Sequence, residues 1–153
     1  MNLPAHISGS DLRAARSADR EPIAELLRTV GLPTCELDTQ LTNFLVGYCQ
    51  GRLAGCVGME WYGKVAFLRS LAVRPEYQGI GLGRRLAVAI LAEAKRLGAS
   101  DAVLLTHSAV KLARSLGFVE VTRDALPTLI LESWEFRGDC CCKAHCMRLS
   151  LST

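Results

Sequence analysis

The sequence lacks the features that mark membrane proteins and nucleic-acid-binding proteins. It contains no apolar run near the roughly 20 residues that cross a bilayer, and its first residues show neither the basic nor the apolar segment of a secretory signal. Charged residues make up only 22% of the chain, and the net charge of +3 is too small to indicate a nucleic-acid partner. We therefore expect a cytoplasmic globular protein that binds neither membranes nor nucleic acids.

The cysteines do not follow the pattern of a disulfide framework. There are seven of them, and an odd number in a chain without a secretory signal argues against paired cysteines. Cys49 and Cys56 lie in apolar segments and are expected to be small core residues. The others are Cys35, Cys140, Cys141, Cys142 and Cys146.

The C-terminal cysteines, with His145 among them, provide enough thiols to ligate zinc. Three adjacent cysteines, however, cannot all point to one side of a strand, and their spacing is not that of paired CxxC motifs. We expect no metal site, and we interpret residues 140–146 as a cysteine-rich loop and the start of a strand. Binding of zinc or of trivalent arsenic by these thiols stays open as an alternative.

The length of 153 residues suits one domain with a substantial core, and residues 1–11 are interpreted as its flexible leader. Neither an internal repeat nor a linker divides the rest. Apolar periodicity and turn residues predict strands at about residues 12–15, 44–50, 53–62, 64–73, 101–107, 118–122 and 146–151. They predict helices at about residues 17–30, 36–44, 84–97 and 108–117, and residues 128–136 are ambiguous.

The order of these elements predicts the fold class. The strand at 64–73, a glycine-rich turn, a helix and the strand at 101–107 imply a right-handed crossover between parallel strands. The strands before that crossover follow one another closely enough to form an antiparallel meander. We therefore expect an α/β fold in which a central mixed sheet carries helices on both faces.

The turn before the third helix carries glycines at alternate positions: Gly79, Gly81 and Gly83. A backbone without Cβ atoms can approach a ligand closely, and the first N–H groups of a helix attract anions. Arg84 and Arg85 add positive charge in the first turn, which suits a phosphate or a pyrophosphate. The spacing differs from the Rossmann pattern, and the Gly-Lys-Ser/Thr of the phosphate loop is missing. The turn therefore predicts a pyrophosphate site of another kind.

The pattern Gln78-x-x-Gly81-x-Gly83, which follows the central strand, resembles the acetyl-CoA-binding motif of the GNAT family of N-acetyltransferases. The segment LARSLGFVEV at residues 112–121 is similar to that family's helix, Gly-Phe pair and strand, and the order of elements agrees. The resemblance covers about residues 12–125. It implies the GNAT fold, an acyltransferase and acetyl-CoA as its co-substrate.

The resemblance also implies which residues bind the co-substrate. The backbone of Leu71, Ala72 and Val73 would bind the pantetheine arm, and the N–H near Leu71 would polarise the thioester carbonyl. The pyrophosphate would be held by Gln78, Gly79, Ile80, Gly81, Leu82, Gly83 and Arg84. Judged by their side chains alone, Leu71 and Val73 could equally be core residues.

Two side chains are candidates for moving protons, because the accepting amine must lose one. Glu60 stands at the end of the strand before the central one, where it could instead be a solvated residue beside Lys64. His107 ends the strand after the glycine turn and its helix, and could relay a proton or merely cap the next helix. The tyrosine that often serves the family as the acid falls on Ala113, so either Tyr62, His107 or solvent replaces it, or the thiolate leaves without a proton.

Arg69 and Ser70 interrupt an otherwise apolar central strand. A guanidinium in such a strand costs free energy unless it is paired. Arg69 could bind a carboxylate or an oxyanion of the acceptor in a bidentate way, with Ser70 beside it. It could equally form a structural ion pair, with Glu60 as one partner.

Several segments together narrow the family. Residues 31–33, 43–45, 55–58, 68–73 and 146–147 resemble the N-acetyltransferases that are associated with arsenic-resistance operons. This implies an acceptor that is a small, acidic, amino-acid-like amine, such as an organoarsenical or a phosphinic compound. The alternatives are a catalytically idle sensor of acyl-CoA or of thiophilic arsenicals, and a protein lysine acetyltransferase. A homodimer is common in the family, and the apolar segment 128–136 could serve one.

Overall fold

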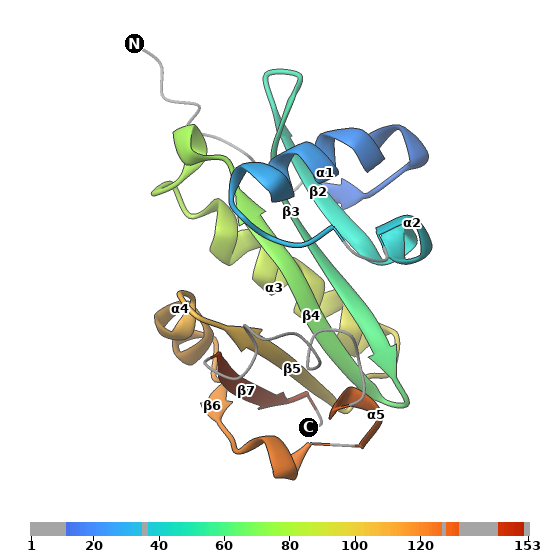
Figure 1. The fold of residues 1–153 in the computed structure, drawn as a ribbon, viewed down its shortest axis with the longest axis vertical. Coiled ribbons are helices and arrows are strands. Elements are labelled where there is room, and N and C mark those ends of the chain that lie inside the picture. Colours follow the sequence, from blue (N-terminus) through green and yellow to red (C-terminus); the bar gives the residue numbers. More distant parts are fainter. Residues whose placement is uncertain (1–11, 35–36, 127, 132–143, 152–153) are drawn as a thin grey trace. The chain divides into compact units, whose positions relative to one another are not determined.

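The computed structural model describes residues 12–34, 37–126, 128–131 and 144–151 (Figure 1). Its strands are β1 Leu12–Ala14, β2 Phe44–Cys49, β3 Arg52–Tyr62, β4 Val65–Val73, β5 Asp101–Thr106, β6 Val119–Glu120 and β7 His145–Ser150. Its helices are α1 Arg20–Thr29, α2 Leu37–Gln40, α3 Leu82–Arg96, α4 Val110–Ser115 and α5 Thr128–Leu131. Short 3₁₀ segments stand at Ser17–Asp19, Leu41–Asn43, Pro75–Tyr77 and Arg123–Ala125.

The strands form a seven-stranded sheet in the order β1-β2-β3-β4-β5-β7-β6. β4 and β5 are parallel, as a crossover through α3 requires. The pairs β1–β2, β2–β3, β5–β7 and β6–β7 are antiparallel. The expected mixed α/β fold is confirmed. Among the described residues, no helix combines the length and the apolar character that crossing a bilayer would need.

Contacts within the chain group its residues into two compact units, and β3, β4 and α3 contribute to both. The first unit comprises the described residues up to 59 together with 69–91. The second unit comprises residues 60–68 and the described residues from 92 onward. A single domain over the whole chain stays a prediction, and the expected leader, residues 1–11, lies outside the described residues.

In the first unit, α1 and α2 cover one face of the strands (Figure 1). Ile23, Leu26 and Leu27 of α1 recur at helical spacing and are fully buried. They form a core with Leu37, Phe44, Val46, Leu53, Cys56 and Ala72. The helix ends at Thr29, and Gly31 follows with a φ of 79°, a left-handed conformation that favours glycine.

In the same unit, α3 lies against the other face of the strands (Figure 1). Its buried residues Leu82, Leu86 and Ile90 recur at helical spacing and form an apolar stripe. A Cβ atom on Gly55 of β3 would lie 2.9 Å from Leu86 Cδ1 and 2.9 Å from the carbonyl oxygen of Ala72. Gly55 therefore allows β3 to approach both the helix and β4 closely.

The second unit has an apolar core of its own around β5. The β5–β7 ladder runs from the Asp101–Ser150 pair to the Thr106–His145 pair. Buried apolar side chains from β4, β5, α5 and β7, together with Leu126 after the last 3₁₀ segment, pack against one another there: Val65, Phe67, Val103, Leu126, Ile130 and Cys146. Burial of these residues from separate segments accounts for the uninterrupted apolar runs in the sequence.

Several expected elements differ in extent from the structure. The helix expected at 17–30 begins with a 3₁₀ segment, and the helix expected at 108–117 is only α4. The helix expected at 36–44 is one turn, α2, followed by a 3₁₀ segment, because Phe44 is buried as the first residue of β2. The strand expected at 118–122 is only β6, since a 3₁₀ segment begins at Arg123. The ambiguous segment 128–136 begins as α5, and its remainder, with its expected part in a homodimer, lies outside the described residues.

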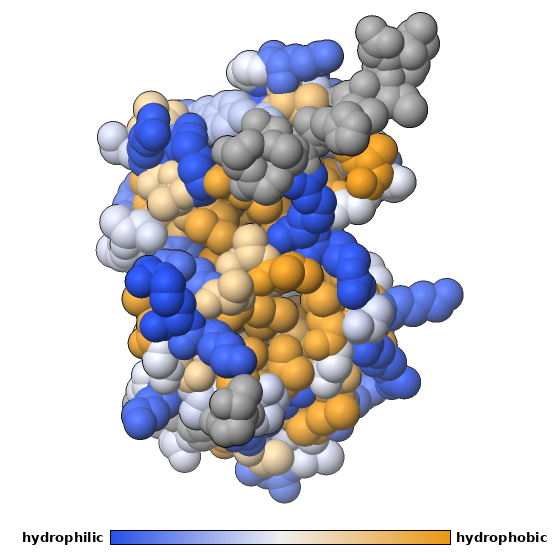
Figure 2. All heavy atoms as spheres, turned by 180° about the vertical axis from the view of Figure 1, so that it is seen from behind, coloured by the Kyte–Doolittle hydropathy of each residue, from blue (hydrophilic) through white to orange (hydrophobic). Residues whose placement is uncertain are grey.

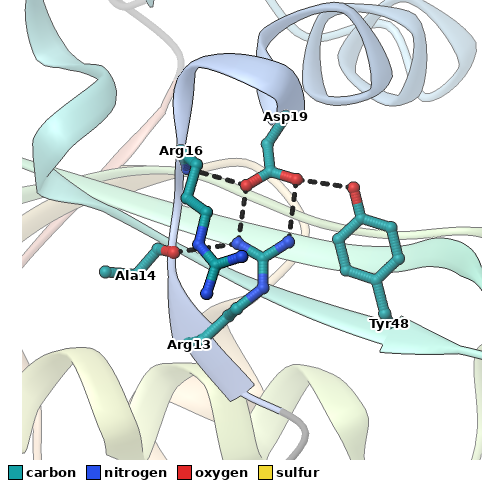
Figure 3. Close-up of polar contacts among 5 residues, drawn as sticks. All are labelled: Arg13, Ala14, Arg16, Asp19 and Tyr48. Atoms are coloured by element: carbon teal, nitrogen blue, oxygen red, sulfur yellow. Dashed lines mark hydrogen bonds and ion pairs between the residues drawn. The ribbon is translucent and has the colours of Figure 1, made fainter.

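Asp19 is a buried charge that connects β1, α1 and β2 of the first unit (Figure 3). Its carboxylate accepts hydrogen bonds from Arg13 at 2.7 and 3.0 Å, from the backbone N–H of Arg16 at 2.7 Å and from the Tyr48 hydroxyl at 2.6 Å. The Arg13 bonds are the main reason that the pKa of Asp19 is lowered to about 2. These donors offset the cost of burying the carboxylate.

Replacing Asp19 tests this cluster. We expect Asp19→Asn to lower the free energy of unfolding by about 3 kcal/mol at pH 7, because Arg13 would keep a part-buried charge without its counter-charge. Since the carboxylate pKa is lowered on folding, the difference from wild type is complete above about pH 4 and shrinks as the pH falls toward 2. Urea unfolding at several pH values measures it.

Asp38→Asn provides the control, because Asp38 is 72% exposed and also pairs with an arginine, Arg20. Solvent screens such a pair, so this variant should unfold at nearly the wild-type urea concentration. Equal midpoints for the two variants would contradict a structural role of the Asp19 cluster.

Candidate functional site

The central strand of the first unit is bent at Ser70. Its φ of 60° is left-handed, and among the described non-glycine residues only Gln50 shares a positive φ. Such a conformation costs about 1–2 kcal/mol for a residue with a Cβ. Arg69 lies over the Phe44 ring, and Ala72 packs into the same core although it is three residues further along. Side chains an odd number apart point to opposite faces of a regular strand, so one extra residue is inserted here as a bulge.

Two side chains hold the Ser70 bulge. The Cys56 thiol lies 3.4 Å from the carbonyl oxygen of Ser70, and Arg69 Nε donates to Ser70 Oγ at 3.0 Å. Arg69 is only 4% exposed, and its guanidinium carbon lies 5.8 Å from the centre of the Phe44 ring. Surrounding contacts of this kind are what allows a strained backbone conformation to persist.

β4 extends beyond its parallel ladder with β5. The ladder runs from the Val65–Asp101 pair to the Leu68–Leu104 pair, whereas β4 continues to Val73. In the continuation Ala72 is buried, and Leu71 and Val73 are half-buried. Because of the bulge it is Ala72 that faces the first core, and Val73 Cγ2 would lie 3.7 Å from a Cβ on Gly83 of α3.

Arg74 fixes the point where β4 ends. It is buried, its Nε donates to the Leu53 carbonyl at 2.6 Å, and its Nη2 lies 2.7 Å from Glu25 Oε1. Its backbone N–H also donates to the Ala54 carbonyl at 2.8 Å. These contacts attach the start of the following turn to β3 and α1.

The glycine loop, residues 78–84, connects this anchor to α3. Gln78 Nε2 donates to the Val73 carbonyl at 2.9 Å. Gly79 and Gly81 have φ values of 85° and 86°, which only glycine adopts without strain, and both are exposed. At the helix start, the backbone N–H of Arg85 donates to the Gly81 carbonyl at 3.1 Å.

This geometry fits an anionic ligand. A Cβ on Gly79 or Gly81 would meet nothing within 4 Å, so the space beside these two residues is open. The N–H groups of the first helical turn have no intrahelical acceptor and carry the positive end of the helix dipole. The glycine loop can therefore receive a phosphate or a pyrophosphate through its backbone.

Glu60 and His107, the expected proton carriers, both belong to the second unit. Glu60 is 3% exposed, and its Oε1 accepts a hydrogen bond from the Tyr62 hydroxyl at 2.7 Å. The alternative of a solvated strand end is therefore wrong. His107 is exposed and follows β5.

The start of α4 excludes the capping role considered for His107. The residue before the helix is Ala109, and its N–H donates to Thr106 Oγ1 at 2.8 Å. Ala113, where the family's tyrosine was expected, is buried in α4, and its carbonyl accepts from the Phe118 N–H at 3.0 Å. This position holds no proton donor in its side chain.

Sequence reasoning missed two residues of the candidate site. From the sequence alone, Cys56 is expected only to be a core residue, and Arg74 has no assigned role. A buried arginine at the end of a strand offered some signal for the second, because such a charge needs partners. Nothing in the sequence indicated that Cys56 contacts the Ser70 carbonyl.

The described residues contain no group of three or more histidine, cysteine, aspartate or glutamate side chains that could hold a metal ion. Cys49, Cys56 and Cys146 are buried free thiols. Cys140, Cys141 and Cys142 lie outside the described residues.

The sequence of this chain is similar to those of known acetyltransferases. The model of the acetyltransferase (GNAT) family matches residues 12–118 of the chain. An amino-acid acetyltransferase of Ralstonia nicotianae is 33% identical over 93 residues, which make up 60% of this chain and 21% of that protein. An uncharacterised N-acetyltransferase of Chlorobaculum tepidum is 26% identical over 148 residues, which make up 92% of this chain and 93% of that protein.

A solved structure has the same fold. N-acetylglutamate synthase from Neisseria gonorrhoeae, complexed with coenzyme A and N-acetyl-glutamate, superposes with a TM-score of 0.82 at 24% identity. The superposition covers 93% of this chain and 35% of that chain. This chain thus spans about a fifth of the Ralstonia protein and about a third of the Neisseria one.

Proposed function

Because this chain belongs to the acetyltransferase (GNAT) family, we propose that it transfers the acetyl group of acetyl-CoA to the amine of a small molecule that carries an acidic group. One observation carries the proposal. In the first unit, the end of β4 carries a bulge and is followed, after the 3₁₀ segment Pro75–Tyr77, by a glycine loop at a helix start. That arrangement offers main-chain groups to an extended arm and, next to them, an anion site to a pyrophosphate.

The residues expected to bind acetyl-CoA all lie in the first unit. We assign the pantetheine arm to the backbone of residues 71–73, which an extended ligand can join as a further strand. We assign the pyrophosphate to the backbone of residues 78–84. When bound, acetyl-CoA supplies the activated acyl group. The protein's part is then to hold the arm, to direct the N–H of Leu71 at the thioester carbonyl and to shield the site from water.

We assign Arg69 and Ser70 to binding of the acceptor amine. The buried guanidinium can bind an acidic group of the acceptor, and Ser70 Oγ orients it through the hydrogen bond to Nε. The names of two similar proteins support an acceptor of this class, because one is an amino-acid acetyltransferase and the other was solved with N-acetyl-glutamate. Organoarsenical and phosphinic amino acids belong to the same chemical class and should be tested with it.

Glu60 is assigned as the group that takes the proton from the amine. It is a buried carboxylate, so water competes little with it, and the Tyr62 hydroxyl orients one of its oxygens. His107 is exposed and is assigned a lesser part in passing that proton to solvent. Since Ala113 has no acidic group, the thiolate of CoA would leave with a proton from Tyr62, from His107 or from solvent, or without one.

The acceptor class is tested by release of free thiol from acetyl-CoA in the presence of amines. Acidic amino acids and their phosphinic and arsinic analogues should react with a lower KM than amines of equal size without the acidic group. Arg69→Ala should raise the KM of the acidic acceptors about tenfold, which removes most of that difference, and leave the Kd of acetyl-CoA nearly unchanged. Binding of acetyl-CoA without turnover of any amine would instead favour a sensor.

The glycine loop is tested by Gly81→Ala. The added methyl group would stand in the open space next to the loop and force a left-handed alanine, so we expect the Kd of CoA to rise at least about tenfold. Calorimetric titration with CoA measures it. Gly63→Ala is the matched control, because Gly63 has a φ of 63° and open space too, but lies in the β3–β4 turn. Both variants should lose similar stability, and an equal Kd in both would refute the assignment.

The proton carrier is tested by Glu60→Gln. This change keeps the size of the side chain and its contact with Tyr62 but removes the base, so kcat should fall about 100-fold. Tyr62→Phe should lower kcat less, and His107→Ala by less than about tenfold. A larger loss in His107→Ala than in Glu60→Gln would make His107 the base. The pre-steady-state release of thiol separates these effects from product release.

A further inference from the structure

The segment of β3 from Gly55 to Gly58 packs unusually closely against its neighbours. A Cβ on Gly58 would lie 2.5 Å from Cε1 of Phe44, so only glycine leaves room for that ring. A Cβ on Gly55 would lie 2.9 Å from the carbonyl oxygen of Ala72. Both glycines therefore permit close approaches, which is the usual reason for glycine inside a strand.

The Phe44 ring that fills the place beside Gly58 supports the residue before the bulge. The guanidinium of Arg69 lies over this ring, and Arg69 Nε donates to Ser70 Oγ. The ring and the guanidinium attract each other, and the guanidinium fixes the Ser70 hydroxyl. Gly58 thus leaves room for Phe44, Phe44 supports Arg69, and Arg69 holds the hydroxyl of Ser70.

Cys56, between the two glycines, acts on the backbone of the bulge. It is fully buried, and its Sγ lies 3.4 Å from the Ser70 carbonyl oxygen. Burial raises the pKa of the Cys56 thiol to about 12. The thiol consequently keeps its proton at physiological pH and can donate it to the carbonyl.

The geometry of the peptide bond transmits this contact to Leu71. The carbonyl of Ser70 and the N–H of Leu71 belong to one planar peptide unit, and in a trans peptide they point in opposite directions. The structure contains no cis peptide among its described residues. A thiol on β3 that holds the Ser70 carbonyl toward β3 therefore directs the Leu71 N–H away from β3.

We propose that Cys56 is a positioning residue for acetyl transfer, and that Gly55–Cys56–Val57–Gly58 is the support on which the Ser70 bulge is built. The inference rests on the proposed function in one respect, the assignment of the Leu71 N–H to the thioester carbonyl. Without the thiol, the Ser70–Leu71 peptide can rotate, and the N–H is no longer held in one direction. Cys56 acts through Ser70 and touches neither substrate.

Two variants of similar size separate the donor from packing. Cys56→Ala removes the donor, and we expect kcat to fall about tenfold while the Kd of acetyl-CoA changes less than threefold. Cys56→Ser restores a donor in the same place and should recover kcat to within about threefold of wild type. Cys49→Ala is the control, because this buried cysteine lies in β2 opposite Arg52. It should keep the wild-type kcat.

A second measurement needs no activity. In the ligand-free protein, the ¹H–¹⁵N resonance of Leu71 should be sharp in wild type and in Cys56→Ser, and broadened or shifted in Cys56→Ala. If wild type binds acetyl-CoA but acetylates no amine, the proposed function fails, and the Leu71 resonance still decides whether Cys56 fixes the bulge. Unchanged kcat and an unchanged Leu71 resonance in Cys56→Ala would overturn the inference. So would equal losses of kcat in the Ala and Ser variants. Cys56→Val replaces Cys56→Ala if that protein is too unstable to isolate.

Discussion

The left-handed conformation of Ser70 is the constraint on which the candidate site depends. It shifts the alternation of β4 by one residue, so Ala72 enters the core and Leu71 does not. The strain is confined to Ser70, and three side chains offset it. Cys56 of β3 contacts the Ser70 carbonyl, and Arg69, which lies over the Phe44 ring, donates to the Ser70 hydroxyl. The direction of the backbone groups beyond the bulge is therefore decided by tertiary packing of the first unit.

The same strand, β3, also decides where the glycine loop begins. Arg74 is attached to the carbonyls of Leu53 and Ala54, and the Arg52–Glu76 ion pair adds a second, exposed contact. The loop itself is rich in glycine and could adopt many conformations. Because both of its ends are fixed, one by Arg74 and the other by α3, fewer conformations are open to the loop. Figure 2, which views the molecule from behind, shows hydrophobic residues side by side with hydrophilic ones on this face.

The sequence predicted those parts of the protein that local rules determine. Apolar periodicity predicts α1, α3 and the central strands, and the spacing of Gln78, Gly81 and Gly83 predicts the turn before α3, because turn and helix-start geometry depend on neighbours in sequence. The anion site at this turn stays a prediction. The position of the bulge at Ser70 depends on Cys56, which is fourteen residues away, and is not determined by neighbours in sequence. The burial of Glu60 and the short extent of α2 were missed for the same reason: both depend on packing between distant segments.

A site made of main-chain groups constrains its sequence in an indirect way. The residues that would touch acetyl-CoA, from Leu71 to Val73 and along the glycine loop, contribute N–H and C=O groups that nearly every residue has. Their own side chains can therefore change with little effect, glycines excepted. Specific side chains are needed behind these groups. Cys56 directs the Ser70–Leu71 peptide, and Arg74 fixes the backbone before the glycine loop. It follows that the residues most informative about this site are buried ones without any contact to a substrate, and that glycine and cysteine in β3 carry functional information that their small side chains conceal.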